Sequence, residues 1–397
     1  MGAVIIRPVE KRNGVGGDMT RFGEDLGLCS KHTEIVLLQD GPRQVALAAS
    51  FQARVLTSTL AGPGGLSHGW VNQNYIAQGT LHPKFNPYGG EDRLWLSPEA
   101  GQFGFHFDPG VPFELPNARV LTAVDREPFD LLEQGDREAV FGKTAELVNW
   151  SGTRFRVRIR RKIVLIGLER VWATLGVSGD GIQAVAFESE NELENAGREP
   201  WRKETGLLGA WVLGMYPASP RSTVVIPYTP GPPGSEGPRA ASYFGELPGD
   251  RLRSLSAGAF FKADGLYRSK IGVHPRHAGV WLGCWDAQES VLTLVRYSRP
   301  PGEALYADGQ WKVQERPYDG DIVSSYNDGP PEPGATSYGP YYELETMSPV
   351  RELVPGDSLR HLHQTFHLMG DRSALDRASR KTLGVGLADI EEALPVA

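Results

Sequence analysis

The chain has 397 residues, of which 22% are charged, with 48 glycines, 30 prolines and a formal net charge of -7. This composition is typical of a globular protein with many turns, and it excludes a fibrous or disordered chain. Because no overall positive field would attract phosphate backbones, we expect no nucleic-acid partner. The two cysteines, Cys29 and Cys284, are too few for a disulfide framework.

Residues 1–30 are predicted to form a lead-in with one short helix. The helix is expected from Asp18 to Cys29, with Asp18 as N-cap and Gly27 near its end. The first residues contain no apolar segment long enough for a signal peptide or a membrane span. We therefore expect a cytoplasmic protein without membrane contact, or a secreted or periplasmic one if the sequence is truncated.

Residues 31–372 are predicted to form one antiparallel β-sandwich domain. Short apolar or alternating runs follow one another, separated by turn signals such as Asp40-Gly41-Pro42. Neither a repeat of 20 to 50 residues nor a sustained βα alternation is present, which favours a sandwich over a propeller or a parallel sheet. The predicted strands include Ile35–Leu38, Val45–Ala49, Arg54–Leu60, Leu94–Leu96, Gln102–Phe107, Phe155–Leu165, Val291–Tyr297 and Leu359–Leu368.

Residues 373–397 are predicted to be helical. Ser373–Thr382 and Leu387–Leu394 are rich in Ala, Leu, Arg and Glu at helical spacing. We expect these helices to pack on the outside of the sandwich.

Polar and aromatic side chains are densest between Asn86 and Glu99. A sugar site combines charged groups that bond hydroxyls with an aromatic ring that packs on the apolar face of the sugar. The alternative is a turn and an edge strand whose acids pair with Arg93 and face solvent. We expect sugar binding by four of these residues, which are Asp92, Arg93, Trp95 and Glu99.

Two glutamates, Glu343 and Glu345, share one face of the segment Tyr341–Pro349 if this segment is a strand. Carboxylates placed in this way repel each other, so one of them keeps its proton and serves as a general acid or base. The alternative is a pair of glutamates on a solvated strand face. The neighbouring Tyr342 is predicted to contribute to binding.

Three cationic or titratable residues, Arg268, Lys270 and His274, lie on one face of the extended run from Tyr267 to Pro275. Such cations bind a uronate or neutralise an enolate. The alternative for His274, which precedes a proline, is a structural role.

Three histidines, His361, His363 and His367, alternate along the predicted strand Leu359–Leu368. Alternate histidines can chelate zinc, but a dedicated site needs further ligands, so we expect a solvated or hydrogen-bonded face and neither metal nor cofactor. The acidic segment Phe187–Asn195 is predicted to be a solvated loop.

Four segments of the sequence resemble segments of a known family. They are Gly89–Leu96, Glu204–Leu208, Ser324–Gly329 and Tyr342–Glu345. On these residues, over roughly positions 30 to 370, the chain resembles an uncharacterised family of the galactose mutarotase-like superfamily. The resemblance implies an all-β supersandwich whose concave sheet binds a mono- or oligosaccharide, and it adds Asn327 to the substrate-binding residues.

The segment Leu344–Pro349 is similar to the one that carries the catalytic glutamate of aldose epimerases, which implies that Glu345 is the general base. The histidine that epimerases place before paired glycines is Tyr88 here, and no histidine lies at 191–195, where their general acid would fall. Candidates for the missing acid are Tyr88, His274 and Glu91. The resemblance implies epimerase-like proton transfer; the alternatives are a glycan lyase or glycoside hydrolase and a non-catalytic carbohydrate-binding module.

Overall fold

The computed structural model describes residues 19–229, 237–241, 247–330 and 337–394. An N-terminal helix is present as predicted, but it begins at Phe22 and ends at Cys29 (α1); its expected N-cap, Asp18, lies outside the described residues. Three further helices precede the C-terminal region, and they are α2 (Gln73–Gln78), α3 (Thr122–Asp125) and α4 (Leu168–Leu175). Within the described residues, no helix is long and apolar enough to cross a membrane.

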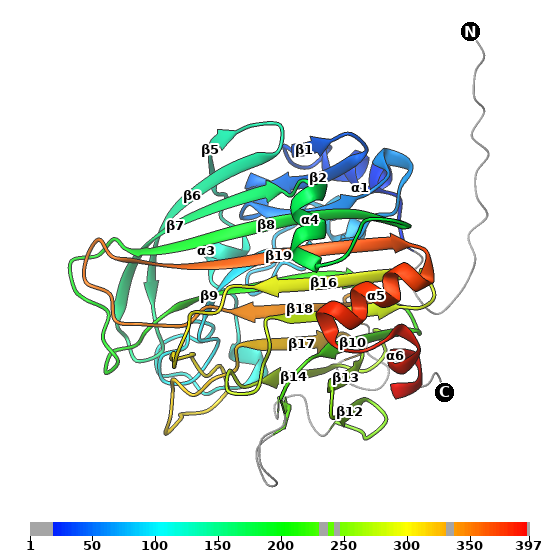
Figure 1. Ribbon diagram of the computed structural model, residues 1–397. Helices are drawn as coiled ribbons and strands as arrows, with labels where there is room; N and C mark the ends of the chain where they lie inside the picture. The colour runs from blue at the N-terminus through cyan, green and yellow to red at the C-terminus, as the bar shows by residue number, and fades with distance from the viewer. Residues whose placement is uncertain (1–18, 230–236, 242–246, 331–336, 395–397) are drawn as a thin grey trace.

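The strands of the described residues form three sheets in which the paired strands are antiparallel (Figure 1). The ten-stranded sheet has the order β12 (Leu252–Leu255), β13 (Gly258–Lys262), β10 (Ser222–Ile226), β15 (Trp281–Asp286), β16 (Val291–Tyr297), β19 (Ser358–Gly370), β8 (Ile182–Asn195), β7 (Arg154–Leu165), β6 (Glu138–Val148) and β5 (Asp130–Gln134). The six-stranded sheet has the order β11 (Arg239–Ala240), β14 (Ser269–Val273), β17 (Val323–Asn327), β18 (Tyr341–Met347), β9 (Gly209–Pro217) and β4 (Arg93–Ser97). The small sheet is β1 (Val36–Asp40), β2 (Arg43–Ala48) and β3 (Arg54–Thr59).

The two large sheets pack face to face around the core. Leu94 and Val212 of the six-stranded sheet belong to the same buried cluster as Val157 and Phe187 of the ten-stranded sheet. The small sheet contributes to this cluster through residues such as Val45. Burial of alternate residues from both sheets is how a sandwich forms its core, so the predicted all-β supersandwich is confirmed.

The outer face of the ten-stranded sheet is covered by α4 and by two C-terminal helices, α5 (Arg372–Leu383) and α6 (Leu387–Ala393) (Figure 1). Their apolar residues, such as Leu375 and Ile390, join Leu292 and Phe366 of the strands in one buried cluster. The prediction that the C-terminal helices pack outside the sandwich is confirmed. The face of the six-stranded sheet that points away from the core is therefore the one left for a binding site.

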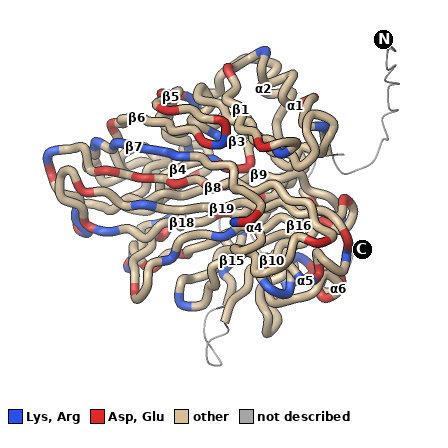
Figure 2. Tube along the Cα trace, turned by 45° about the horizontal axis from the view of Figure 1, so that its top comes forward, with Lys and Arg blue, Asp and Glu red and all other residues tan. Residues whose placement is uncertain are grey.

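The acidic segment Phe187–Asn195 is a strand, and its prediction as a solvated loop is wrong. It forms the second half of β8, and its acids lie opposite the basic run of β7, which Figure 2 shows in blue. Arg158 lies opposite Glu194, and the two side chains form an ion pair of 2.5 Å. Each charged run is stable as a strand because the other supplies its counter-charges across the ladder.

The prediction of a strand over Gln102–Phe107 is also wrong, because this stretch is a loop. Gly101 has a φ of 80°, and a Cβ atom on Gly104 would lie 2.3 Å from the Cα of Ala100. These two glycines fold the chain into tight turns that a strand does not make. Phe105 and Phe107 are nevertheless buried, which explains why the segment has the apolar pattern of a strand.

Candidate functional site

A cleft lies over the outward face of the six-stranded sheet. The side chains of β18 alternate, so that Glu343 and Glu345 line the cleft while Tyr342 and Leu344 belong to the core between the sheets. Other strands of the sheet contribute residues such as Lys270 from β14. The floor of the cleft is thus one face of a rigid sheet, and its walls are the loops that connect the strands.

The cleft has two lobes, which share the residues Glu99, Trp211 and Lys270. The aromatic lobe has a volume of about 480 Å³, and its lining includes Phe85, Trp95, His106, Trp311, Tyr338 and Glu343. The polar lobe has a volume of about 400 Å³, and its lining includes Ser97, Arg239, Gly272, Asp308, Gln310 and Asp321.

Glu345 is held in one orientation at the floor of the cleft. Its side chain is fully buried, and its Oε2 accepts three hydrogen bonds of 2.8 Å, from Trp211 Nε1, Lys270 Nζ and Ser324 Oγ. Its Oε1 has no hydrogen-bond partner among the described residues. A buried carboxylate oxygen without a donor is costly unless a ligand or water supplies one, so Oε1 is the atom that is ready to accept a proton or a hydroxyl.

Lys270 compensates the charge of Glu345. Its Nζ lies 2.8 Å from Glu345 Oε2 and 4.6 Å from the centre of the Trp211 ring. Burial alone would lower the pKa of Lys270, but the carboxylates of Glu345 and Glu99 outweigh burial and raise it. The ammonium group therefore remains charged, and it provides a fixed positive charge beside the carboxylate.

Glu343 has a different environment on the same strand face. Its Oε1 accepts a hydrogen bond of 2.5 Å from Arg93 Nη2, and the Arg93 guanidinium stacks 4.9 Å from the centre of the Trp95 ring. Burial raises the pKa of Glu343; Arg93 opposes this shift, and the charge of Glu345 adds to it. Glu343 consequently keeps its proton to a higher pH than an exposed glutamate does.

His106 lines the aromatic lobe and was not singled out by the sequence. It is 4% exposed and packs edge-on against Trp95, with ring centres 5.2 Å apart. Burial, with the charges of Arg119 and Lys270, lowers its pKa to about 3, so the imidazole is neutral. Its Nε2 has no hydrogen-bond partner among the described residues. The only signal for His106 in the local sequence is its position between two phenylalanines. This pattern does not distinguish a residue that lines a cleft from one that lies in the core.

Trp211 and Trp311 are also cleft residues that the sequence did not indicate. Trp211 lies on β9 between the glutamates and the wall, 5.4 Å from Trp95 between ring centres. Trp311 donates a hydrogen bond of 3.0 Å to Glu99 Oε1. Aromatic faces and charged hydrogen-bonding groups thus alternate around the cleft.

The structure brings seven of the predicted site residues together in this cleft. They are Arg93, Trp95, Glu99, Arg268, Lys270, Glu343 and Glu345. They come from three separate segments of the sequence that β4, β14 and β18 place on the same face of one sheet.

Four other predicted site residues lie outside the lining of both lobes. Tyr88 stacks on Phe51 with ring centres 4.1 Å apart in a separate apolar cluster. His274 follows β14 and pairs with an aspartate at 2.9 Å, away from the cleft. Tyr342 faces the core because it alternates with the cleft-facing glutamates, and Asn327 Oδ1 accepts a hydrogen bond from the backbone of Gly265. These side chains support the strands and loops on which the cleft residues lie.

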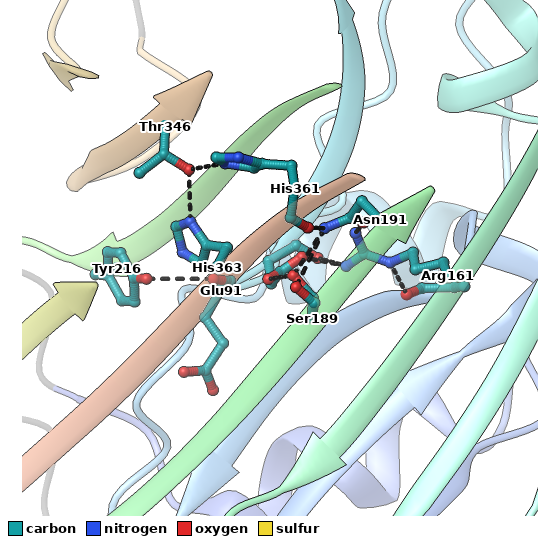
Figure 3. A network of polar contacts seen from close by, with 10 residues as sticks. Glu91, Arg161, Ser189, Asn191, Tyr216, Thr346, His361 and His363 are labelled. Carbon is teal, nitrogen blue, oxygen red and sulfur yellow. Dashed lines mark hydrogen bonds and ion pairs between the residues drawn. The ribbon is translucent and has the colours of Figure 1, made fainter. Parts of the chain in front are cut away.

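The remaining two, Glu91 and Asp92, lie between the sheets in a buried polar network. Figure 3 shows Glu91 in this network, beside Tyr216 and His363. Asp92 forms an ion pair with Arg161, and its Oδ2 accepts a hydrogen bond of 2.7 Å from Ser189 Oγ. Arg161 also donates a hydrogen bond of 2.7 Å to Asn191 Oδ1. Glu91 and Asp92 come directly before β4. Arg93, the first residue of β4, is therefore the first of the three whose side chain points toward the cleft.

The alternating histidines of β19 also lie in the buried interior between the sheets. Of the two alternatives expected for their face, the solvated one is therefore excluded and the hydrogen-bonded one is present. His361 Nε2 and His363 Nδ1 both lie 2.8 Å from Thr346 Oγ1 (Figure 3). Since Thr346 has one hydroxyl proton, at least one of these imidazoles must donate to it. His367 Nε2 lies 2.6 Å from Glu91 Oε2. Among the described residues, no group of three or more His, Cys, Asp or Glu is arranged to hold a metal ion.

Comparison with known proteins places this geometry in a recognisable fold. The model of a protein family described as "Family of unknown function (DUF6786)" matches residues 20–394. No curated protein matches the sequence. A solved structure from Escherichia coli K12, described provisionally as an aldose 1-epimerase, is 10% identical, covers 85% of this chain and 100% of its own, and has a TM-score of 0.52.

A galactose mutarotase-like protein from Lactobacillus casei is 11% identical, covers 84% of this chain and 100% of its own, and has a TM-score of 0.44. At such identities, the likeness to the Escherichia coli structure shows the fold alone. The chain has the galactose mutarotase-like fold that its sequence resembles.

Proposed function

The chain belongs to the family of unknown function DUF6786, and we propose that its members act on a carbohydrate by aldose-epimerase-like proton transfer, with Glu345 as the general base. The observation that carries the proposal is the state of the Glu345 carboxylate, because three donors fix Oε2 while Oε1 has no partner among the described residues. A base of this kind needs one oriented oxygen that no other donor occupies.

The composition of the cleft supports a sugar as the substrate. Trp95, Trp211 and Trp311 offer apolar faces on which a pyranose ring can pack, and the charged groups between them can bond its hydroxyls. The charges largely pair with each other, as Arg93 does with Glu343 and Lys270 with Glu345. A cleft of balanced charge suits a neutral polyhydroxylic ligand better than a strongly anionic one.

The proposed step requires a base and an acid on opposite sides of the C1–O5 bond. Glu345 Oε1 takes the proton of the anomeric hydroxyl, the C1–O5 bond breaks, and the ring oxygen takes a proton from Glu343. The open-chain aldehyde turns about its C1–C2 bond, and ring closure returns both protons by the reverse transfers. The two glutamates are two residues apart on one strand, so their Cα atoms are separated by about 7 Å, which leaves room for part of a ring between the carboxyl groups.

Glu343 suits the role of the acid because burial raises its pKa. An acid works best when its pKa is near the working pH. His106 is a poorer acid, since its pKa is lowered to about 3 and its imidazole is neutral. Its neutral ring can instead bond a sugar hydroxyl from the wall of the aromatic lobe.

Proton NMR of anomer exchange on a panel of reducing sugars tests the proposal. We expect the wild type to accelerate exchange and Glu345→Gln to lose that acceleration. Glu194→Gln is the matched control, because it makes the same substitution in the ion-paired face of β8 and should leave exchange unchanged. Exchange that survives in Glu345→Gln would overturn the role of the base, and new vinyl or reducing-end signals would identify a lyase or a hydrolase instead.

A non-catalytic carbohydrate-binding module is the second candidate, and one observation favours it. Both cleft glutamates are already paired with cations, and ion pairs of this kind can bond sugar hydroxyls without moving a proton. This function predicts saturable sugar binding with no exchange above the uncatalysed rate. It also predicts that Glu345→Gln weakens binding without changing any rate.

A further inference from the structure

The position of Glu345 relative to the two lobes carries information about the size of the substrate. Two of the three groups that donate to its carboxylate, Trp211 and Lys270, line both lobes. The third donor, Ser324, lines only the polar lobe, whereas Glu345 itself lines the aromatic lobe. The carboxylate therefore lies in the floor at the junction of the lobes, and space extends from it in two directions.

The two directions differ in chemistry. The aromatic lobe offers ring faces, including Trp95 and Tyr338, against which a sugar ring can stack. The polar lobe offers an ion pair of 3.3 Å between Arg239 and Asp321, and it contains Asp308. Sugar hydroxyls can accept hydrogen bonds from a guanidinium group and donate hydrogen bonds to carboxylates. Binding of this kind does not need an aromatic ring.

Small residues keep the polar lobe open. A Cβ atom on Gly272 of β14 would lie 2.1 Å from Asp321 Oδ2, so a glycine is required for this carboxylate to approach the strand. Gly309 also lines the lobe and has no side chain to fill it. The resulting volume of about 400 Å³ lies within the range of about 300–1,000 Å³ for a complete small-molecule site. One monosaccharide in the aromatic lobe would leave this second space unused.

We propose that the substrate is a saccharide of at least two units, with the reacting ring in the aromatic lobe and the adjoining unit in the polar lobe. The proposal rests on the proposed function, because it takes Glu345 as the reacting group. A ring above Glu345 points its anomeric hydroxyl at the floor, while its other hydroxyls lie along the cleft. The adjoining unit then follows the cleft axis past Trp211 and Lys270 into the polar lobe.

Calorimetric titration of Glu345→Gln, which prevents turnover, with a monosaccharide and with reducing disaccharides of several linkages tests this inference. We expect at least one disaccharide to bind about tenfold or more tightly than the monosaccharide, which corresponds to about 1.4 kcal/mol. The added substitution Arg239→Trp replaces a side chain that lies opposite Gly272 and faces the polar lobe, and it should remove this advantage without changing the monosaccharide affinity. Arg154→Trp, at an exposed arginine outside the lining of either lobe, is the matched control.

The outcomes separate the two proposals. Disaccharides that bind no more tightly than the monosaccharide would overturn the two-unit substrate, and so would an Arg239→Trp effect equal on both ligands. In either case, anomer exchange of a monosaccharide by the wild type would leave the proposed reaction standing. A disaccharide advantage that Arg239→Trp abolishes, in a wild type without any exchange activity, would support the two-lobed site and overturn the reaction.

Discussion

Glu345 in the cleft and Glu91 between the sheets are both fully buried, yet the charged groups around them differ. Glu345 has the ammonium group of Lys270 at 2.8 Å. Glu91 has the imidazole of His367 at 2.6 Å, and burial lowers the pKa of that imidazole to about 3. Burial, with the charge of Asp92, raises the pKa of Glu91 to about 8, so its carboxyl group keeps its proton at neutral pH and donates it to His367.

The two regions also differ in access. Glu345 lines the floor of the cleft, whereas Glu91 lines neither lobe and belongs to a network between the sheets (Figure 3). Burial alone is therefore no guide to function in this fold. A nearby cation and a position in the lining of a cleft are what distinguish a reactive carboxylate from a structural one.

The same substitution in the two regions should give the largest contrast. Glu345→Gln removes the proposed base, and we expect it to slow anomer exchange by about 10²–10⁴-fold. Glu91→Gln keeps a hydrogen-bonding side chain in the interior and should leave exchange unchanged. Rates from saturation-transfer NMR check both variants, and a loss of exchange in Glu91→Gln with an intact fold would show that the interior network takes part in the reaction.

Removal of a charge from the interior should destabilise the fold strongly. Asp92→Asn leaves Arg161 buried without its counter-ion, and we expect a loss of about 3–5 kcal/mol in the free energy of unfolding. Urea denaturation followed by tryptophan fluorescence measures this loss. A decrease below about 1 kcal/mol would mean that water reaches the guanidinium group, in contrast to the enclosed network described above.

The protonated state of Glu91 predicts a pH dependence of stability. Its pKa is about 8 in the folded chain against an ordinary value of 4.5, so the folded state binds the extra proton between these values. Its contribution is fully present below pH 4.5 and is lost as the pH rises to about 8. We expect the stability of the wild type minus that of Glu91→Gln to fall over this range by on the order of a few kcal/mol, as measured by urea titrations at several pH values. A difference that is constant with pH would show that Glu91 is ionised in the fold.

The exposed charge ladder should give the smallest effect. Arg158 and Glu194 form an ion pair of 2.5 Å on the outer face of the ten-stranded sheet, with the arginine side chain 58% exposed. A double-mutant cycle with Arg158→Ala and Glu194→Ala should give a coupling of about 0.2–1 kcal/mol that decreases with added salt. A coupling as large as the Asp92 effect would remove the distinction between the exposed and the buried pairs.

Local patterns were sufficient for much of the fold. The alternation of Phe155–Leu165 predicted β7 because one buried and one exposed face impose a period of two along a strand. The helical spacing near the C-terminus predicted α5 and α6 in the same way. The prediction for the acidic segment Phe187–Asn195 was wrong because its counter-charges lie on another strand. A local sequence pattern does not contain that information.

The candidate site was predictable only in part, for the same reason. Alternation alone places Glu343 and Glu345 on one face of β18, but it does not state which face is the core. Glu91 and Asp92 are charged residue types, as are Arg93 and Glu99 in the same segment, yet the sheet turns the first two to the interior. His106 comes from a loop, where no periodicity indicates the direction of a side chain.

The sequence by itself determined the all-β class, the strands with a one-sided apolar pattern, the C-terminal helices and the pair of glutamates on one strand face. These features depend on contacts between neighbours in the sequence and on the period of a strand or a helix. Only the tertiary structure decided that Glu345 meets Lys270, Trp211 and Ser324, and that Glu91 meets His367. Those contacts join residues 21 to 276 positions apart. The order of strands in the two sheets, rather than any local preference, therefore determines which carboxylate lines the cleft and which lies between the sheets.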